Sequence, residues 1–340
     1  MFIIENYWLA VSACVFCMIC WGSWSNTQKL AAKTWRFELF YWDFVIGLVL
    51  TSLLWGFTAG TFGSDGISFV DDLKQADSQS IMYAMLGGIV WNVGNLLFVM
   101  AIALAGMSVA FPIGGGIAWL GGIIFNYILE VQGGGSLESL PKTMLFSGVA
   151  VIFVAIYLSM VAYKKLADQQ RKPSAKGIIL SIIAGLFFAF FYGFVVKSFN
   201  PEIVTGGTGN LGPYTGTLFF TLGAFVTTIA LNPIVMKKPV EGEPVTFKQY
   251  FAGDLKTHAI GVLGGLIWAS GMVVSFMGVG SADPAIAYAL SNASPVVAIL
   301  WGVFVWKEFK DAPKGTNKIL TTMFVLFLIG LVVITASKVM

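Results

Sequence analysis

Residues 80–105 read SIMYAMLGGIVWNVGNLLFVMAIALA, an unbroken stretch that contains no Asp, Glu, Lys or Arg. A helix of this length rises about 39 Å at about 1.5 Å per residue, which exceeds the roughly 30 Å hydrocarbon core of a bilayer. The whole chain follows this pattern, because 57% of its 340 residues are hydrophobic and only 11% are charged. Soluble domains carry about 25% charged residues, so the sequence predicts a membrane protein.

Other stretches along the chain are also long and apolar enough to span a membrane. We therefore expect an all-α polytopic membrane protein with ten transmembrane helices. The net charge of +3 is small, and no basic stretch is interleaved with aromatic residues, which argues against a nucleic-acid partner. The ten predicted spans are residues 7–25, 39–60, 80–105, 107–129, 143–163, 176–198, 213–236, 257–279, 283–305 and 318–337.

Positive charge is distributed unevenly between alternate loops. Of the 20 Lys and Arg residues, all but Lys74, Lys142, Lys197 and Lys338 fall on the same side of the predicted topology. The positive-inside rule therefore places both termini on the non-cytoplasmic side. Residues 1–6 contain no basic residue, so the first span does not have the pattern of a cleaved signal. We expect a multi-pass protein of the plasma membrane, such as a bacterial inner membrane.

Short sequences in the first half of the chain recur in the second half. Gly87-Gly88-Ile89-Val90-Trp91 corresponds to Gly264-Gly265-Leu266-Ile267-Trp268 at an offset of 177 residues. Ser108-Val109-Ala110-Phe111 corresponds to Ala285-Ile286-Ala287-Tyr288 at the same offset. More weakly, Cys20-Trp21-Gly22 pairs with Phe191-Tyr192-Gly193. These matches indicate an internal repeat, and chance matching of Gly and Trp in apolar helices is the alternative.

The repeat predicts how the chain is divided. Residues 1–163 would form a first five-helix repeat, residues 164–175 a basic cytoplasmic linker, and residues 176–340 a second five-helix repeat. Because five is an odd number, the second repeat would enter the membrane with opposite polarity. Many secondary transporters have this 5+5 inverted-repeat architecture, with the solute site between the two halves.

Motifs for other classes of function do not occur in the sequence. It contains no G-x-x-x-x-G-K-[ST], no H-E-x-x-H and only one histidine, so we expect no enzyme activity, no catalytic residues, no metal and no cofactor. Cys14, Cys17 and Cys20 have a spacing that resembles an iron–sulfur ligand run. They lie on one predicted helix without a fourth ligand, and we interpret them as small packing residues.

Several segments resemble known transporters: Gly87-Gly88-x-x-Trp91-x-x-Gly94-Asn95, Gly106-Met107-Ser108, Leu263 to Trp268, and Lys307-Glu308. On these segments the sequence resembles the drug/metabolite transporter superfamily, and within it the rhamnose–proton symporter and glucose/ribose porter group. The run from Trp35 to Glu38 is also similar to rhamnose symporters, whereas Tyr41-Trp42-Asp43-Phe44 is similar to a segment of ureide permeases. The resemblance implies ten helices arranged as five plus five inverted, and a sugar or a ureide as solute.

Aromatic and amide side chains within the spans are the candidates for solute binding. An aromatic ring can cover the apolar face of a sugar or stack on a heterocycle, while amide groups bond polar edges. A membrane-interface aromatic belt and interhelical hydrogen bonding are the structural alternatives. Asn126, Lys197 and His258 are expected at the interface instead. The predicted solute-binding residues are Trp21, Asn26, Trp91, Asn92, Asn95, Tyr192, Trp268, Tyr288 and Asn292.

Asp43 and, less favourably, Glu38 are the candidates for proton coupling. A charged side chain at the centre of a span costs about 2.5–3.5 kcal/mol on insertion scales, so a carboxylate there suggests a function. Asp43 could exchange a proton between two access states, or it could form a structural ion pair with Lys29 or Arg36. Pro112 and Pro295 are predicted hinges, because proline frees the carbonyl one turn before it.

Together these features predict a secondary active transporter that imports a small polar solute by alternating access. A monosaccharide carried with a proton is the preferred interpretation, and the proton gradient would supply the energy. A purine or ureide permease of the same fold is the alternative, followed by a drug or metabolite exporter. Expected partners are the solute and the lipid bilayer, and the protein could be a monomer or a homodimer.

Overall fold

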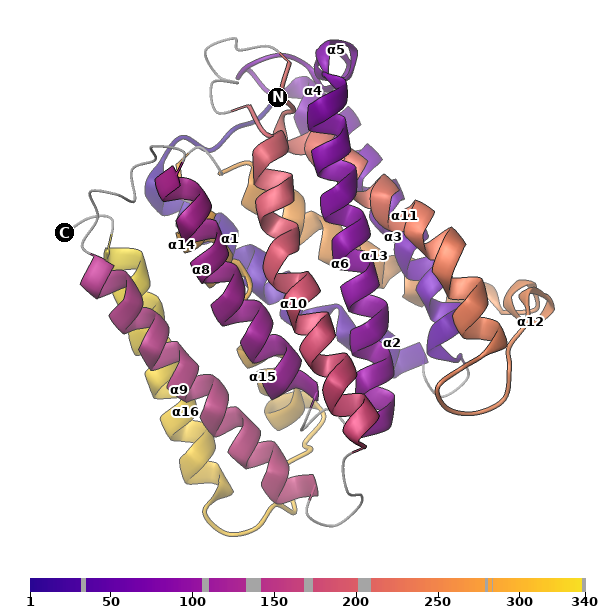
Figure 1. Cartoon of the computed structure of the whole chain (residues 1–340), viewed down its shortest axis with the longest axis vertical. Coiled ribbons are helices and arrows are strands. Elements are labelled where there is room, and N and C mark those ends of the chain that lie inside the picture. Colours follow the sequence, from indigo (N-terminus) through magenta and orange to yellow (C-terminus); the bar gives the residue numbers. More distant parts are fainter. Residues whose placement is uncertain are drawn as a thin grey trace. The chain divides into compact units, whose positions relative to one another are not determined.

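The chain was analysed as a computed structural model, whose described residues are 1–31, 35–105, 110–132, 142–167, 174–200, 209–278, 281–282 and 284–337. Helices dominate this part of the chain (Figure 1). Within it, nine helical segments are long and apolar enough to cross a membrane, and Ile113–Leu129 is a shorter apolar helix. The prediction of an all-helical polytopic membrane protein is therefore confirmed. The shorter helix falls in the predicted span 107–129, whose residues 106–109 lie outside the described part.

The helices group into two compact units. Unit 1 contains Met1–Asn92 and Phe191–Ala282, and unit 2 contains Val93–Phe190 and Asp283–Met340. Each unit combines segments from both halves of the sequence. The division at residues 164–175 remains a prediction, and residues 168–173 lie outside the described part.

Unit 1 contains most of the predicted solute-binding residues and both candidates for proton coupling. Two long helices, α6 (Ser78–Ala105) and α10 (Ala175–Ser198), begin or end in this unit and continue into unit 2. The other helices of unit 1 are α1 (Tyr7–Ser23), α2 (Ser25–Ala31), α3 (Phe37–Phe57), α4 (Ala59–Phe62), α5 (Phe69–Gln75), α11 (Pro213–Lys237), α12 (Phe247–Phe251) and α13 (Leu255–Phe276).

Unit 2 contains two helices that are interrupted. In one, the π-helical segment η1 (Phe111–Gly115) leads into α8 (Gly116–Gln132). In the other, α14 (Pro284–Ser291), α15 (Pro295–Leu300) and the π-helical η3 (Trp301–Val305) follow one another. The remaining helices, α9 (Lys142–Ala167) and α16 (Thr316–Ala336), pack closely against each other, because Gly148 and Gly330 each leave room for the opposing backbone.

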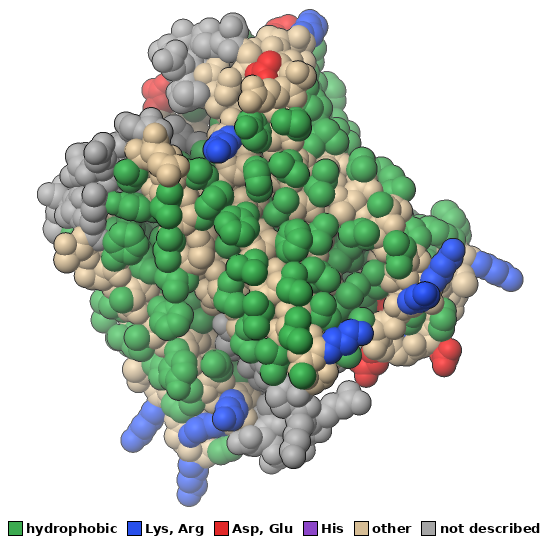
Figure 2. Space-filling view, viewed as in Figure 1, with side chains coloured by type: hydrophobic (Ala, Val, Ile, Leu, Met, Phe, Trp, Pro, Cys, Tyr) green, Lys and Arg blue, Asp and Glu red, His purple; other side chains and the backbone are tan. Residues whose placement is uncertain are grey.

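The surface of the long helices is apolar. On the face drawn in Figure 2, hydrophobic side chains cover most of these helices, and the Lys and Arg side chains lie away from that band. Large exposed side chains such as Leu50, Leu54, Ile179, Ile229 and Val332 would be costly in water. A bilayer instead gives them an apolar solvent, while the helical backbone satisfies its own hydrogen bonds.

Side-chain caps begin several of these helices. Asn6 accepts hydrogen bonds from the first turn of α1, and Asp254 accepts one from Thr257 N at the start of α13. The short helices α5 and α12 are capped by Ser68 and Thr246, and Thr246 forms a full capping box with Gln249. Each short helix thus has a defined beginning despite its small size.

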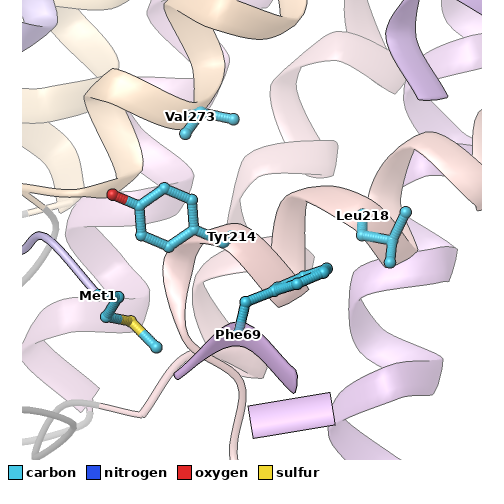
Figure 3. Close-up of a cluster of buried hydrophobic side chains, with 5 residues drawn as sticks. All are labelled: Met1, Phe69, Tyr214, Leu218 and Val273. Carbon is cyan, nitrogen blue, oxygen red and sulfur yellow. The ribbon is translucent and has the colours of Figure 1, made fainter. Parts of the chain in front are cut away.

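Helix α5 is anchored to the start of α11. Phe69 is fully buried in a hydrophobic cluster with Tyr214, Leu218, Val273 and Met1 (Figure 3). Asp72 lies one turn after Phe69 and bonds both its own helix and the residue before α11. Its Oδ2 accepts a hydrogen bond from Gly212 N at 2.8 Å, and its Oδ1 accepts one from Gln75 Nε2 at 2.7 Å. Burial raises the pKa of Asp72 above its ordinary value, although these hydrogen bonds oppose the increase.

Replacing Asp72 with alanine should destabilise unit 1. The change leaves the buried Gly212 N–H without its acceptor, at a cost of about 1.5–3 kcal/mol, which corresponds to a midpoint roughly 5 °C lower. Because the folded-state pKa is raised, the contribution of Asp72 is fully present at low pH and falls as pH rises through that pKa. The loss in Asp72→Ala should therefore be larger at pH 4 than at pH 8. Thermal unfolding in detergent measures both effects.

The neighbouring Asp71 provides the matched control. Its carboxylate is exposed and bonds only to Ser68 and Lys74 within the same helix. Asp71→Ala should leave the thermal midpoint and its pH dependence close to those of the native protein. Equal losses in the two variants would contradict the anchoring role of Asp72.

Candidate functional site

Glycines bring α6 and α11 into backbone contact. Gly88 belongs to the first of the two recurring motifs. Any Cβ at this position would collide with the carbonyl oxygen of Phe220 on α11. On the other side, a Cβ at Gly223 would collide with the carbonyl oxygen of Met85 on α6. Only glycine permits this approach without moving a helix, since backbone atoms cannot rotate away.

The same arrangement joins α3 and α13. A Cβ at Gly265 would collide with the carbonyl oxygen of Phe44, and one at Gly47 would collide with the carbonyl oxygen of Val262. The two sets of contacts correspond closely in sequence. Gly88 and Gly265 are 177 residues apart, as are Met85 and Val262, while Gly47 and Gly223, and Phe44 and Phe220, are 176 apart.

These close contacts position a buried group of aromatic rings. Trp268 lies parallel to Trp21, with ring centroids 5.0 Å apart, and parallel to Phe220 at 5.8 Å. Trp91 packs against Trp268 with centroids 4.4 Å apart. The Trp21 indole N–H also donates to the backbone carbonyl of Trp268 at 3.2 Å. We call Trp21, Trp91, Phe220 and Trp268 the aromatic stack. Its three tryptophans are among the predicted solute-binding residues.

Three polar side chains are joined by hydrogen bonds, and the middle one, Asn92, is the residue after Trp91 of the aromatic stack. Tyr41 OH donates to Asn92 Oδ1 at 2.7 Å, and Asn92 Nδ2 donates to Thr228 Oγ1 at 3.0 Å. All three residues belong to unit 1, and both Asn92 and Thr228 are fully buried. The carboxamide therefore bridges α3, α6 and α11, which is the interhelical role that the sequence leaves open as an alternative. We call Tyr41, Asn92 and Thr228 the polar line.

Two other predicted solute residues of unit 1 lie apart from these contacts. Tyr192 packs on Phe276 and Phe191, and it is Phe191 that reaches Trp21 and Phe220. Asn26 donates locally to the carbonyl of Ser23 at 2.8 Å, where α1 gives way to α2.

The remaining predicted solute and hinge residues belong to unit 2. Tyr288 is fully buried, with its hydroxyl 2.8 Å from the Ala118 carbonyl oxygen and 3.0 Å from that of Phe188. Asn292 donates to the backbone carbonyl of Tyr288 at 3.2 Å. Asn95 is buried on α6, Pro295 begins α15, and Pro112 lies within η1. Both predicted hinges thus coincide with irregular helix, although no hinge motion follows from that alone.

Asp43 is the centre of a second buried cluster in unit 1. Only 2% of it is exposed, and its Oδ1 accepts a hydrogen bond from Tyr250 OH at 2.7 Å and lies 2.8 Å from His258 Nδ1. The Trp35 ring packs edge-on against His258, with centroids 5.2 Å apart. At Gly261, any Cβ would collide with the Asp43 side chain, so this glycine lets α13 approach the carboxylate. Neither of the ion pairs expected with Lys29 or Arg36 is formed by Asp43 in the described part of the chain.

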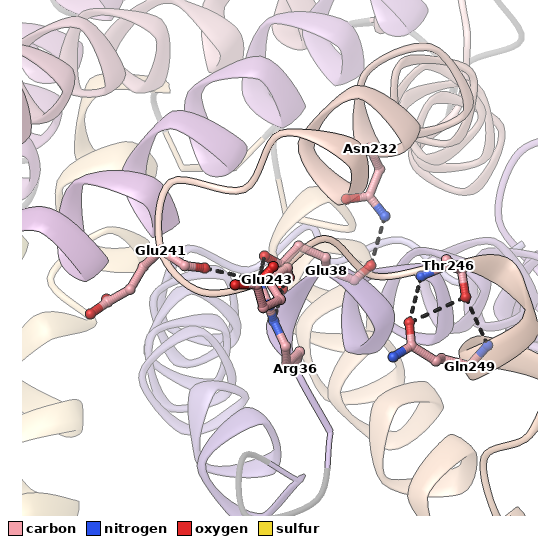
Figure 4. A network of polar contacts seen from close by, with 7 residues as sticks. All are labelled: Arg36, Glu38, Asn232, Glu241, Glu243, Thr246 and Gln249. Carbon is pink, nitrogen blue, oxygen red and sulfur yellow. Dashed lines mark hydrogen bonds and ion pairs between the residues drawn. The ribbon is translucent and has the colours of Figure 1, made fainter.

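Glu38 has a different environment, although its side chain is also fully buried. It forms an ion pair with Arg36, which also donates to the backbone carbonyls of Glu241 and Glu243 (Figure 4). Asn232 Nδ2 donates to the Glu38 carbonyl at 2.8 Å. These contacts tie the start of α3 to α11 and to the segment before α12, which is a structural role.

The sequence analysis missed the partners of Asp43. It placed His258 at the interface, whereas the structure bonds this residue to a buried carboxylate. Tyr250, Trp35, Tyr41 and Thr228 were not singled out either. One signal was available: His258 is the only histidine, and it lies one turn after Asp254, a typical helix N-cap. No spacing rule connects it to Asp43, which is 215 residues away.

The described residues contain no group of three or more His, Cys, Asp or Glu side chains that could hold a metal ion. The predicted packing role of the cysteines agrees with their position, since Cys14, Cys17 and Cys20 are all buried on α1. A Cβ at Gly271 of α13 would meet Cys20, so small side chains are needed on both helices at this contact.

Comparison with known proteins identifies relatives along the full chain. The family model for ureide permeases matches residues 40–176 and 168–337. Ureide permease 1 and ureide permease 2 of Arabidopsis thaliana are 24% and 25% identical, with 99% of each chain covered. A Listeria monocytogenes protein named for sugar uptake is 21% identical, with 76% of this chain and 80% of that protein covered. One solved crystal structure shares the fold, with a TM-score of 0.63, 15% identity and 97% coverage of both chains.

Replacing Gly265 with alanine should separate α3 from α13. The added methyl group collides with the Phe44 carbonyl, and overpacking of this kind costs about 1–3 kcal/mol. We expect a lower thermal midpoint in detergent and a change in near-UV circular dichroism, because Trp268 would shift against Trp21.

Gly116→Ala is the matched control for Gly265→Ala. Nothing lies within 4 Å of a Cβ at Gly116, which begins α8. Alanine there should be neutral or stabilising by about 0.4–1 kcal/mol, since it restricts the unfolded chain. Equal effects at the two positions would contradict the close-packing role of Gly265.

Proposed function

The chain belongs to the ureide permease family and is therefore a membrane transporter of small solutes and not an enzyme, and on this premise we propose that it imports a planar solute together with a proton. The proposed solute class is a ureide or nucleobase, whose flat ring carries amide-type N–H and C=O groups. The observation that carries the proposal is the aromatic stack, a set of four buried rings on membrane-spanning helices, three of which are parallel.

The aromatic stack suits a flat solute because the rings of Trp21, Trp268 and Phe220 are already parallel. Trp21 and Trp268 are within 11° of parallel, and Phe220 and Trp268 within 10°. A planar ring that enters between two of them would replace one stacking contact with two. Stacking of a nucleobase on an aromatic side chain contributes about 1–3 kcal/mol, independent of which base is bound. The stack thus provides affinity, and selectivity has to come from polar groups.

The polar line can supply that selectivity. Asn92 presents one acceptor and one donor group, and at present these bond Tyr41 and Thr228. A ureide edge offers the complementary donor and acceptor pair, so it could take over these bonds when the helices shift. A solute that lacks them would leave buried polar groups unpaired, which strongly disfavours its binding.

We propose that transport proceeds by alternating access in a 5+5 inverted repeat. The glycine contacts support this relation, because α3 with α13 and α11 with α6 use equivalent residues at offsets of 176–177. Pro112 and Pro295 would act as hinges where their helices are irregular. Asp43 would carry the coupling proton, while Glu38 stays paired with Arg36. Under this proposal the protein lies in the plasma membrane with both termini outside the cytoplasm.

A monosaccharide is the second candidate solute. It is supported by the Listeria monocytogenes relative that is named for sugar uptake, and by the ability of tryptophan faces to cover the apolar side of a sugar ring. The two candidates differ in shape, since a sugar is puckered and does not fill the gap between parallel rings as a flat heterocycle does.

Uptake into proteoliposomes distinguishes these candidates. With an acidic exterior, labelled hydantoin or hypoxanthine should accumulate at least tenfold over protein-free vesicles, and glucose should not. Accumulation of glucose alone would favour the sugar candidate. If none of these solutes moved or displaced another, the proposal of a planar solute would fail.

Trp268→Ala should weaken solute binding at least tenfold, because a loss of about 1.4 kcal/mol of stacking corresponds to a factor of ten. Trp8→Ala is the control, since Trp8 is 54% exposed and lies outside the aromatic stack. The KM of uptake for each variant, measured at constant pH gradient, tests the difference. An unchanged KM in Trp268→Ala would exclude the aromatic stack as the binding site.

Asp43→Asn should abolish accumulation driven by a pH gradient and preserve exchange of labelled solute across the membrane without a gradient. Asparagine keeps the shape of the side chain but cannot release a proton. Uptake that still responds to the gradient in this variant would exclude Asp43 as the coupling residue.

A further inference from the structure

The two oxygens of Asp43 have unequal surroundings. Oδ1 is bonded to two side chains, because Tyr250 OH lies 2.7 Å away and His258 Nδ1 2.8 Å away. Oδ2 is buried and has no hydrogen-bond partner. A buried carboxylate oxygen without a donor is unfavourable, and native structures rarely leave one in that state.

A proton would resolve this imbalance. When it binds to Oδ2, an O–H bond forms, the carboxylate becomes a neutral acid, and no other bond breaks. When it binds to His258 instead, the imidazolium and the carboxylate form a charge-assisted hydrogen bond through Nδ1 and Oδ1. The bound proton therefore has two alternative positions within one cluster, Oδ2 of Asp43 or Nε2 of His258, and the hydrogen bond from Nδ1–H to Oδ1 is kept in both.

We propose, building on the proton-coupled transport proposed above, that Asp43 and His258 together form a single proton-binding site, with Tyr250 as its positioning residue. Oδ2 is the position that accepts the proton, and His258 shares it. Tyr250 holds Oδ1 from α12, so the site is assembled from three elements: α3, α12 and α13. Proton binding is then a property of the pair and cannot be assigned to Asp43 alone.

The packing around the pair limits its other contacts. Gly261 allows α13 to lie against the Asp43 side chain, and Gly253 allows Trp35 and His258 to meet, since a Cβ at Gly253 would collide with both. Trp35 also lies beside Tyr250, with ring centroids 6.1 Å apart. Its buried indole N–H is a further donor beside the Asp43 carboxylate, although it makes no hydrogen bond of ideal geometry.

The other charged side chains near Asp43 and His258 either bond to other residues or are exposed. Asp254, one turn before His258, caps α13 by accepting a hydrogen bond from Thr257 N at 2.7 Å. On α3, Arg36 and Glu38 are paired with each other. Lys248 and Lys256 are exposed and lie two residues before Tyr250 and His258, respectively. His258 and Tyr250 are thus the titratable side chains that bond Asp43 in the described part of the chain.

The hydroxyl of Tyr250 keeps its proton beside Asp43 and therefore remains a hydrogen-bond donor. Burial and the negative charge of Asp43 both raise the pKa of its hydroxyl well above the ordinary value, so the phenol keeps its proton. The short helix α12 that carries it has no buried residue, and Phe251 beside it is 78% exposed. The hydroxyl of Tyr250 is thus the main polar contact of α12 with α3.

Nuclear magnetic resonance on histidine-labelled protein tests the site without any solute. Because the chain has one histidine, protein labelled with ¹⁵N-histidine in lipid nanodiscs gives a single set of imidazole signals. The pH at which these signals change should differ by one unit or more between native protein and Asp43→Asn, with a smaller difference for Tyr250→Phe. Asp71→Asn, whose carboxylate bonds only Ser68 and Lys74, should leave them unchanged. Identical signals in native protein and Asp43→Asn would overturn the proposal.

The pH profile of uptake provides the second test. His258→Gln keeps a donor for Oδ1 but cannot take up a proton, so the pH of half-maximal uptake should move by one unit or more while KM at saturating proton concentration changes little. A profile unchanged in His258→Gln would reject a shared proton. Histidine signals that depend on Asp43 in a protein that moves no solute would reject the proposed function and retain the site.

Discussion

Helices α3 and α13 approach so closely that glycine is required at three points of their contact. Gly47 and Gly265 each face a carbonyl of the opposite helix, and Gly261 faces the side chain of Asp43. Both candidate clusters of unit 1, the aromatic stack and the Asp43 cluster, depend on this contact. On α13, Trp268 follows Gly265 by three residues and His258 precedes Gly261 by three. The helical period therefore puts both side chains near the contact surface. A methyl group at one of these glycines would disturb the aromatic stack and the Asp43 cluster together.

Such close packing is the expected solution inside a membrane. Lipid is as apolar as leucine, so association of helices relies on van der Waals contact and interhelical hydrogen bonds, and small residues favour both. Polar side chains must also be satisfied without water. In unit 1, Asn92 bridges three helices, and hydroxyl groups such as those of Thr228 and Thr221 donate to carbonyls of their own helix. Oδ2 of Asp43 is the one carboxylate oxygen among the buried side-chain atoms without a hydrogen-bond partner in the described part of the chain.

Hydrophobicity and local signals were sufficient to predict most of the fold. Long apolar runs determine the membrane spans, and the recurring Gly-Gly-x-x-Trp motif identified both the packing glycines and two of the stacked tryptophans. Contacts between residues far apart in the sequence could not be predicted in this way. Nothing in the sequence near Asp43 indicates that His258 and Tyr250, more than 200 residues away, would bond to it. Glu38 and Asp43 are both buried acidic residues on α3, and only the residues that they bond to distinguish them.

The two short helices illustrate how a repeat can duplicate geometry without duplicating chemistry. Under the proposed repeat, α5 and α12 occupy equivalent connections, and their N-caps, Ser68 and Thr246, are 178 residues apart. Their roles differ. Helix α5 is buried through Phe69, and its Asp72 bonds the backbone of Gly212, whereas α12 is exposed and directs Tyr250 to Asp43. The residue 176 positions after Asp43 is Phe219, which cannot bind a proton. Asp43, with its bonds to Tyr250 and His258, therefore stands at only one of the two positions that the proposed repeat would make equivalent.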